Sequence, residues 1–173
     1  MWYISDTHFG HRNAVEKHGR PFSSIEEHDE TIIANWNSKV GKDEIVYVLG
    51  DFWYRGQSAP INYIKRLKGK KILIAGNHDK KWLRVFGARG FESVHQYLET
   101  ENAVLFHYPI VEWNGEKRGV PHIFGHVHAN HTPWCAPNSY NACVDINGWS
   151  PVTMEELKIN HAKWRKTYED IGD

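Results

Sequence analysis

The sequence predicts an α/β fold, and three observations lead to that class. Short apolar runs rich in β-branched and aromatic residues alternate with segments that carry helix-capping signals. The length of 173 residues is that of one ordinary domain. Hydrophobic residues make up 40% of the chain and charged residues 24%, as in globular proteins. Residues 1–173 are therefore expected to form a single domain in which helices pack on a sheet.

The expected strands are short and are bounded by turn-forming residues. A glycine follows three of them, which marks the point where the chain leaves the sheet. The predicted strands are residues 2–5, 45–49, 72–75, 103–106, 123–124 and 143–146. Because the strands after Phe91 follow one another closely, the second half of the chain is expected to be more antiparallel.

Three helices are expected between and after these strands, each beginning at a capping residue or a proline. The signals are Ser24 with Glu27 for a helix over residues 24–38, Ser58 with Pro60 for a helix that Gly69 ends, and Thr153 with Glu156 for a C-terminal helix. The apolar residues of the last helix that can pack on the domain are Leu157, Ala162, Trp164 and Tyr168.

The charge balance and the apolar pattern argue against several classes of partner. The 21 Lys and Arg residues balance the 21 Asp and Glu residues, so nucleic acid is not the favoured partner. No apolar run reaches the roughly 20 residues that cross a bilayer, so no membrane partner is expected. Cys135 and Cys143 are too few for a disulfide framework, which fits a reducing compartment. A soluble cytoplasmic protein is expected, and its oligomeric state stays open.

Histidine is the unusual component of the composition, with 12 residues, and it is the commonest transition-metal ligand. Residues that can bind metals recur directly after the predicted strands. They are Asp6, His8, Asp51, Asn77, His78, Asp79, His107, His126 and His128. Ligands of α/β sheets bind beyond the carboxyl ends of the strands, so we expect these side chains to converge at one edge.

The chemistry of this set favours a site with two metal ions. Carboxylate, amide and imidazole ligands together suit divalent Mn, Fe, Zn, Ni or Co better than Ca. Seven ligands are more than one ion uses. A carboxylate at the centre of the set can bind both of two ions, and Asp51 is the best placed in chain order to do so. Two ions roughly 3.5 to 4 Å apart can hold a bridging hydroxide and stabilise an in-line displacement. The set therefore indicates hydrolysis of phosphoesters.

The same residues form an ordered series of motifs that resembles the signature of calcineurin-like metallophosphoesterases. The blocks are Asp6-Thr7-His8, Gly50-Asp51, Gly76-Asn77-His78-Asp79, His107 and Gly125-His126-Val127-His128. The resemblance implies a four-layer α/β/β/α sandwich of two mixed sheets, with the dimetal site at the carboxyl ends of the strands. It implies a first ion held by Asp6, His8, Asp51 and His128, and a second held by Asp51, Asn77, His107 and His126.

The resemblance also implies a role for the Asn-His-Asp block. His78 would serve as general acid or transition-state stabiliser, with Asp79 orienting it. An imidazole held by a carboxylate keeps its proton more easily near neutral pH. Mn²⁺ is the expected ion, with Fe, Zn, Ni or Co as alternatives.

Four residues near these motifs are candidates for substrate binding. Arg12 and Arg20 follow the first motif and could clamp phosphate oxygens, although surface charges explain them equally well. Trp53 and Tyr54 follow Asp51 and could wall the pocket or stack on a nucleobase, with core packing an equal or better explanation.

Two further features after the first and last motifs have no firm assignment. His11 and His131 are the least clear of the remaining histidines, which are otherwise expected to be surface or hydrogen-bonded residues. The loop over residues 129–140, with Trp134, follows the last predicted ligands and is a candidate for setting specificity.

The function expected from these residues is hydrolysis of phosphodiester bonds, with monoesters as an open alternative, by in-line attack of a hydroxide bound to two metals. The expected substrate is a nucleotide or another small phosphoester. The rival hypotheses are a non-catalytic metal-binding scaffold and a nuclease acting on DNA or RNA ends. The nuclease would need a basic groove and further domains, which 173 residues without net charge do not predict.

Overall fold

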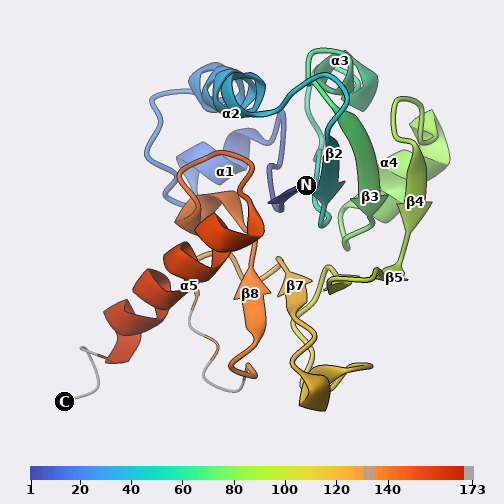
Figure 1. Cartoon of the computed structure of the whole chain (residues 1–173). Helices are drawn as coiled ribbons and strands as arrows, with labels where there is room; N and C mark the ends of the chain where they lie inside the picture. Colours follow the sequence, from blue (N-terminus) through green and yellow to red (C-terminus); the bar gives the residue numbers. More distant parts are fainter. Residues whose placement is uncertain (131, 133–134, 170–173) are drawn as a thin grey trace.

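Two four-stranded sheets form the centre of the protein in a computed structural model, which describes residues 1–130, 132 and 135–169 (Figure 1). Each sheet has its strands in chain order. The first sheet contains β1 (Trp2–Ile4), β2 (Ile45–Val48), β3 (Lys70–Ile74) and β4 (Ser93–His95), all parallel. The second contains β5 (Tyr97–Glu99), β6 (Val104–Phe106), β7 (His122–Phe124) and β8 (Ser139–Asn141).

The helices lie on both sides of this pair of sheets. Figure 1 shows α2 and α3 beside the first sheet and α5 beside β8. The helical segments are α1 (Arg12–Glu16), α2 (Ile25–Lys39), α3 (Pro60–Ile64), α4 (Asp79–Phe86) and α5 (Met154–Glu169), with short 3₁₀ turns at η1 (Glu116–Arg118) and η2 (Val144–Ile146). The fold is therefore the predicted α/β arrangement with two sheets, but the first sheet is all parallel and the second alone is mixed. In the described part of the chain, no helix combines the length and apolar character that crossing a bilayer requires.

Alternating side chains of β2 show how the layers pack. Val46 and Val48 point into a core that contains Trp36 of α2. Tyr47 and Leu49 point into a second core, between the sheets, with Leu105 of β6. The period of two along a strand thus makes β2 a wall of both cores. The sequence shows this as a continuous apolar run, since neither face of the strand meets solvent.

The predicted capping signals at two helices are confirmed. Ser24 Oγ accepts a hydrogen bond from the Glu27 amide at 3.1 Å. Thr153 and Glu156 form the full reciprocal box, with hydrogen bonds of 2.9 and 3.3 Å. These bonds satisfy amides at the helix starts that lack partners within the helix.

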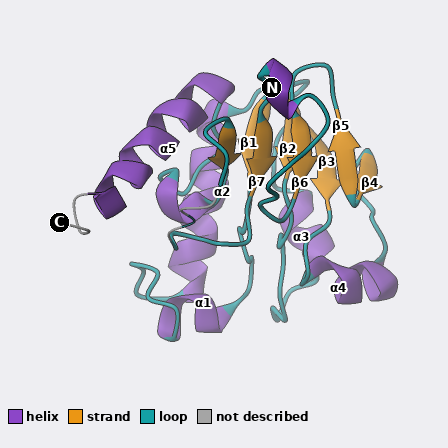
Figure 2. Cartoon of the chain, turned by 90° about the horizontal axis from the view of Figure 1, so that it is seen from below, coloured by secondary structure: helices purple, strands orange, loops and turns teal. Residues whose placement is uncertain are grey.

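Backbone hydrogen bonds join the ends of strands from both sheets. The Asp6 amide donates to the Gly50 carbonyl at 3.0 Å, which ties the end of β1 to the end of β2. The Ser5 amide donates to the Ala142 carbonyl at 2.9 Å and so links β1 to the segment after β8. The loops that follow these strands therefore meet at one edge (Figure 2).

The structure corrects the predicted strand over residues 143–146. Residues 144–146 form η2, Cys143 forms an isolated parallel bridge with Ser5, and the strand is β8, which lies earlier in the chain. The reason is local hydrogen bonding. The side-chain amide of Asn147 donates to the carbonyls of Asn141 and Cys143, which curls the chain away from the sheet.

Other boundaries also differ from the predictions. Only β5 and β6 pair antiparallel in the second sheet, because the chain between β6 and β7 crosses back and lets β7 and β8 run parallel. The second helix ends at Ile64, well before Gly69. In α5, Ala162 was expected to pack on the domain but is exposed, and its neighbour His161 is buried instead. The short helices α1 and α4 were not predicted.

Candidate metal centre

All seven predicted ligands lie at the edge where the strands end. Asp6 and His8 follow β1, Asp51 follows β2, and Asn77 precedes α4. His107 follows β6, while His126 and His128 follow β7. Each ligand is therefore held by a turn that leaves a sheet, as the spacing of the motifs predicted.

The first group of ligand atoms surrounds Asp6. The Nε2 atoms of His8 and His128 both lie 3.9 Å from Asp6 Oδ1. His8 Nε2 also lies 3.9 Å from Asp51 Oδ2. Atoms that bind one ion at roughly 2.1 Å are separated by about 3 to 4 Å, so this spacing suits a single cation.

The second group lies on the other side of Asp51. His107 Nε2 is 3.6 Å from Asp51 Oδ2 and 3.0 Å from Asn77 Oδ1. His126 Nδ1 is 3.1 Å from the same Asn77 oxygen. Asp51 Oδ2 thus faces ligands of both groups, which is the position of a bridging carboxylate.

Buried polar atoms without partners show that the first group fits a metal ion. Within the described residues, Asp6 Oδ1 and both ring nitrogens of His8 are buried and have no hydrogen-bond partner. Leaving such atoms unpaired costs about 1 to 3 kcal/mol each, and more for a charged group. A divalent cation would satisfy the oxygen and Nε2 together, and the carboxylate and imidazole donors suit a transition metal.

The other oxygen of each central carboxylate is fixed by the backbone. Asp6 Oδ2 accepts a hydrogen bond from the His126 amide at 2.9 Å. Asp51 Oδ1 accepts one from the His78 amide, also at 2.9 Å. These bonds aim Asp6 Oδ1 and Asp51 Oδ2 at the histidines, so the site is oriented before an ion binds.

Two of the predicted histidine ligands are oriented by oxygen atoms that contact Nδ1, on the ring edge away from the other ligands. His107 Nδ1 is 2.7 Å from the Leu49 carbonyl, so it carries the proton and leaves Nε2 with its lone pair toward Asp51. His128 Nδ1 lies 3.0 Å from Asp145 Oδ2 and is oriented in the same way. Sequence reasoning missed Asp145, because it lies in residues 143–146 that were predicted to form a strand.

Arg20 supports Asp145, and this geometry corrects the prediction that Arg20 clamps phosphate. Its guanidinium donates twice to Asp145, at 3.0 and 3.2 Å, and to the carbonyls of Asp6 and Thr7. A contact with His28 Nε2 occupies the remaining N–H group. The side chain is buried and its donors are used within the protein, so it holds the first ligand loop in place.

The backbone at the ligands adopts an unfavourable conformation. Among the described residues, seven other than glycine have positive φ, and five of these are predicted ligands: Asp6, His8, Asp51, His126 and His128. Each such residue costs on the order of 1 kcal/mol, so strain concentrates at this edge. Glycine is needed beside them: a Cβ on Gly125 would lie 2.5 Å from Asp6 Oδ2, and one on Gly76 would lie 2.3 Å from Asp51 Oδ1.

His78 lies at the edge of the centre, and its Nε2 is 3.8 Å from Asp51 Oδ2. Asp79 does not orient its imidazole through a hydrogen bond. The Asp79 carboxylate instead accepts from the amides of Gly76, Asp51 and Phe52 and from Trp82 Nε1. Asp79 therefore fixes the two loops that carry the ligands.

Burial sets the protonation of these groups in the absence of an ion. It lowers the pKa of His78, and the charge of Asp79 offsets this only in part, contrary to the expectation that a carboxylate keeps His78 protonated. It raises the pKa of Asp51 to about 7, although nearby His107 opposes the shift. It lowers the pKa of His8 well below its ordinary value. A neutral imidazole is the form that binds a metal.

The remaining predicted substrate residues differ in position. Trp53 is only 9% exposed and its Nε1 donates to the Ser58 carbonyl, so it is a core residue and not a pocket wall. The Tyr54 ring lies 4.3 Å from the His78 ring, centroid to centroid, and borders the site. Arg12 is exposed and forms a 4.0 Å ion pair with Glu16. His131 and Trp134 lie outside the described residues.

A two-sheet α/β fold in which two candidate ligand groups share one carboxylate is the arrangement expected of a dinuclear metalloprotein. The sequence profile of the calcineurin-like phosphoesterases matches residues 1–167, and the chain belongs to this family.

Relatives match nearly the whole chain. An uncharacterised protein of Methanocaldococcus jannaschii is 33% identical over 99% of this chain and 97% of its own length. The Gene 66 protein of Mycobacterium phage D29 is 26% identical over 91% of this chain and 94% of its own length. The crystal structure of a protein of unknown function from Aquifex aeolicus superimposes with a TM-score of 0.65 and 26% identity, covering 92% of this chain and 97% of that one.

Proposed function

We propose that this protein is a metal-dependent phosphoesterase that hydrolyses phosphodiester bonds in nucleotides or other small phosphoesters. Membership of the calcineurin-like phosphoesterases supports the reaction class. The observation that carries the proposal is the position of Asp51 Oδ2, within 3.6 to 3.9 Å of His107 and His8 from the two ligand groups. Two ions, with Mn²⁺ as the first candidate, would stabilise charge on the phosphoryl oxygens and lower the pKa of a water at the site.

The residues around the ions have distinct tasks in this proposal. A cavity of about 480 Å³ lies over the first ligand group and is lined by His8, His78 and His128. A phosphoryl group bound there lies beside His78, whose ring is about one-third exposed. His78 can donate an N–H hydrogen bond to a phosphoryl oxygen or to the oxygen that leaves. Asp79 and Arg20 keep the loops that carry the ligands rigid.

The test is hydrolysis of bis(p-nitrophenyl) phosphate and p-nitrophenyl phosphate by protein that has been treated with a chelator, before and after addition of Mn²⁺. We expect Mn²⁺ to restore cleavage of the diester. His78→Ala should keep its metal and lose rate, by roughly 10² to 10⁴-fold, as for loss of a group that transfers or shares a proton. Asp51→Asn should lose both metal and rate.

Asp43→Asn is the matched control for Asp51→Asn, because Asp43 is exposed and precedes β2, whereas Asp51 follows that strand. It should retain the activity of the unaltered protein. Bound metal without turnover of either ester would favour the non-catalytic scaffold. Turnover that survives in Asp51→Asn would contradict the proposed site.

A further inference from the structure

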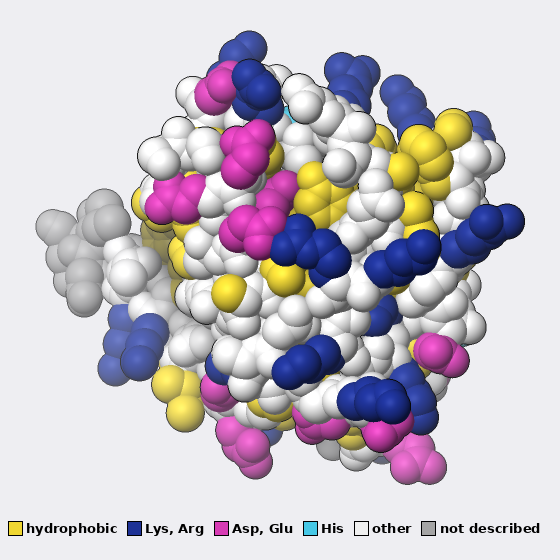
Figure 3. Space-filling model, turned by 90° about the horizontal axis from the view of Figure 1, so that it is seen from above, with side chains coloured by type: hydrophobic (Ala, Val, Ile, Leu, Met, Phe, Trp, Pro, Cys, Tyr) yellow, Lys and Arg dark blue, Asp and Glu magenta, His cyan; other side chains and the backbone are white. Residues whose placement is uncertain are grey.

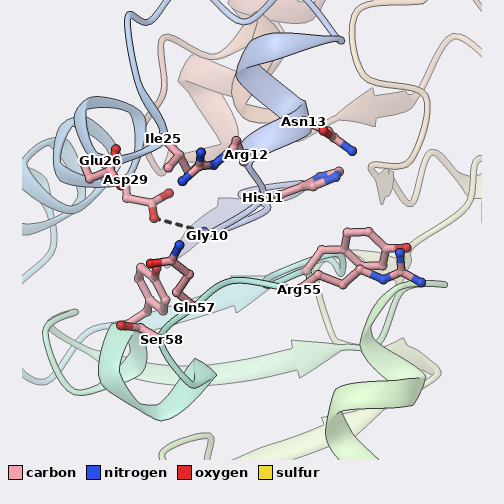
Figure 4. A pocket seen from close by; sticks show the side chains of 12 residues that line it. Gly10, His11, Arg12, Asn13, Ile25, Glu26, Asp29, Arg55, Gln57 and Ser58 are labelled. Carbon is pink, nitrogen blue, oxygen red and sulfur yellow. Dashed lines mark hydrogen bonds between the residues drawn. The ribbon is translucent and has the colours of Figure 1, made fainter.

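A second cavity adjoins the candidate metal centre. Its volume is about 370 Å³, within the range of pockets that hold small organic ligands. Figure 4 shows that its walls come from α1, from α2 and from the segment between β2 and α3. The residues that matter for the argument are His11, Glu26, Tyr54, Arg55 and Gln57.

Four rings in mutual contact, one of them that of the predicted ligand His8, connect this cavity with the candidate metal centre. His8 lies 5.4 Å from His11 and 5.5 Å from His78, centroid to centroid. Tyr54 lies 4.7 Å from His11 and 4.3 Å from His78. His11 lines both cavities, and Tyr54 of the second cavity contacts His78 of the first, so the two cavities adjoin at these rings.

The groups that line the cavity have unused hydrogen-bonding capacity. In the described part of the chain, neither the Gln57 amide nor the Glu26 carboxylate forms a side-chain hydrogen bond or an ion pair within 4.0 Å. Figure 4 shows Gln57 directed between Gly10 and Asp29, toward the wall that α2 forms. Among the described residues, His11 Nδ1 is buried and has no hydrogen-bond partner. The cavity therefore offers donors and acceptors to a polar ligand.

Flat surfaces and positive charge complete the lining. The Arg55 guanidinium carbon lies 5.1 Å from the Tyr54 ring centroid, which is a cation–π contact. Arg55 lines the cavity and has a φ of 51°, an unfavourable backbone conformation for a residue other than glycine. An aromatic face next to a guanidinium and an amide is the chemistry that recognises a nucleobase and its sugar.

We propose that this cavity binds the leaving group of the substrate and that this group is a nucleoside, with Gln57 as a residue that determines specificity. The inference rests on the proposed function. Hydrolysis adds the hydroxyl of water to phosphorus and breaks the bond from phosphorus to the nucleoside oxygen, which takes up the proton. Because His78 faces that oxygen and Tyr54 packs on His78, the nucleoside lies on the Tyr54 side.

The experiment measures binding separately from turnover. Equilibrium dialysis of the Mn²⁺-loaded protein against adenosine, guanosine, cytidine and uridine should show that at least one binds with a Kd in the millimolar range or below. Gln57→Ala should raise that Kd about 3- to 10-fold, the effect of one lost hydrogen bond. Gln96→Ala removes an exposed glutamine between β4 and β5 and should leave the Kd unchanged.

A second measurement tests whether the nucleoside bound in this cavity is the leaving group of the reaction. The ratio of kcat/KM for a dinucleoside monophosphate to that for bis(p-nitrophenyl) phosphate should fall in Gln57→Ala and stay constant in Gln96→Ala. Absence of nucleoside binding, or an equal Kd in Gln57→Ala, would overturn the inference while leaving hydrolysis of the aryl diester intact. Nucleoside binding that depends on Gln57, without turnover of any ester, would support the cavity and contradict the proposed function.

Discussion

Asp145 is not one of the predicted ligands, but it orients one of them, His128. Burial alone would raise the pKa of Asp145, but the hydrogen bond with His128 and the charge of Arg20 outweigh it and hold the pKa well below its ordinary range. The carboxylate is therefore charged at neutral pH. It fixes the His128 ring with Nε2 toward Asp6, which is the orientation that binding an ion requires.

The first prediction concerns this residue. Asp145→Asn should weaken Mn²⁺ binding by roughly 10- to 100-fold, because the neutral amide no longer fixes the His128 ring or balances the Arg20 charge. Titration of metal-free protein with Mn²⁺ measures the effect. Asp43→Asn, in the exposed loop before β2, should bind Mn²⁺ with unchanged affinity. Equal affinities in all three proteins would show that Asp145 has no part in the site.

The positions of the predicted ligands at the strand ends could be read from the sequence. The side-chain contacts of neighbouring residues could not. Asp6, Asp51 and His126 directly follow short apolar runs, so their place at the ends of strands is a local property. Arg20 and Trp53 have no such signal. Their directions depend on Asp145 and on Ser58, contacts that exist only once the chain has folded.

At the scale of elements, α5 shows the limit of helical periodicity. Leu157 and Trp164 lie on its buried face as predicted, while His161 occupies the buried position between them. The spacing of apolar residues along a helix does not identify a buried histidine, because histidine is counted as polar. The Asn141 amide donates to His161 Nδ1 at 3.2 Å, and this bond ties α5 to β8.

The second prediction follows from this contact. Burial lowers the pKa of His161 to about 4, with nearby Arg165 adding to the shift. Between pH 6.5 and 4 the unfolded chain binds a proton that the folded chain does not, so the free energy of unfolding falls as pH falls. The loss amounts to up to about 3 kcal/mol over this range. His161→Asn keeps an acceptor for the Asn141 amide and should have a smaller pH dependence in urea denaturation. An unchanged slope in this variant would contradict the assignment.

At the scale of the whole molecule, the zero net charge conceals a separation of charge. Residues 55–89 contain 10 of the 21 Lys and Arg residues and one of the 21 Asp and Glu residues. In the upper half of Figure 3, acidic side chains gather on the left and Lys and Arg side chains on the right. Residues 55–89 include α4, which begins next to His78. Under the proposed function, this positive charge would raise the local concentration of anionic phosphoesters at that side of the site.

The third prediction concerns the stability of the whole domain without metal. Because the folded pKa of Asp51 is about 7 and its ordinary value is 3.8, the folded chain holds an extra proton between these values. The free energy of unfolding therefore falls as pH rises from about 4 to 7. Asp51→Asn removes this cost and should make the metal-free protein more stable at pH 7.5, by up to about 4 kcal/mol.

With metal present, the unaltered protein should be more stable than Asp51→Asn, the reverse of the order without metal. Under the proposed function Mn²⁺ binds only the folded protein, so it should raise the melting temperature of the unaltered chain, with a much smaller effect on Asp51→Asn. Thermal and urea denaturation with EDTA and with Mn²⁺ measure both effects. Equal free energies of unfolding of the two metal-free proteins would show that the Asp51 charge does not destabilise the fold.

The central claim is that two ions share Asp51, and the most direct test is the number of metal ions bound per chain, measured together with diester cleavage on the same sample. The protein is treated with a chelator, dialysed against Mn²⁺ and assayed for bound metal and for hydrolysis of bis(p-nitrophenyl) phosphate. We expect close to two ions per chain, activity that rises with occupancy, and loss of both in Asp51→Asn. One ion or none at saturation, or two ions that persist in Asp51→Asn, would contradict the shared carboxylate.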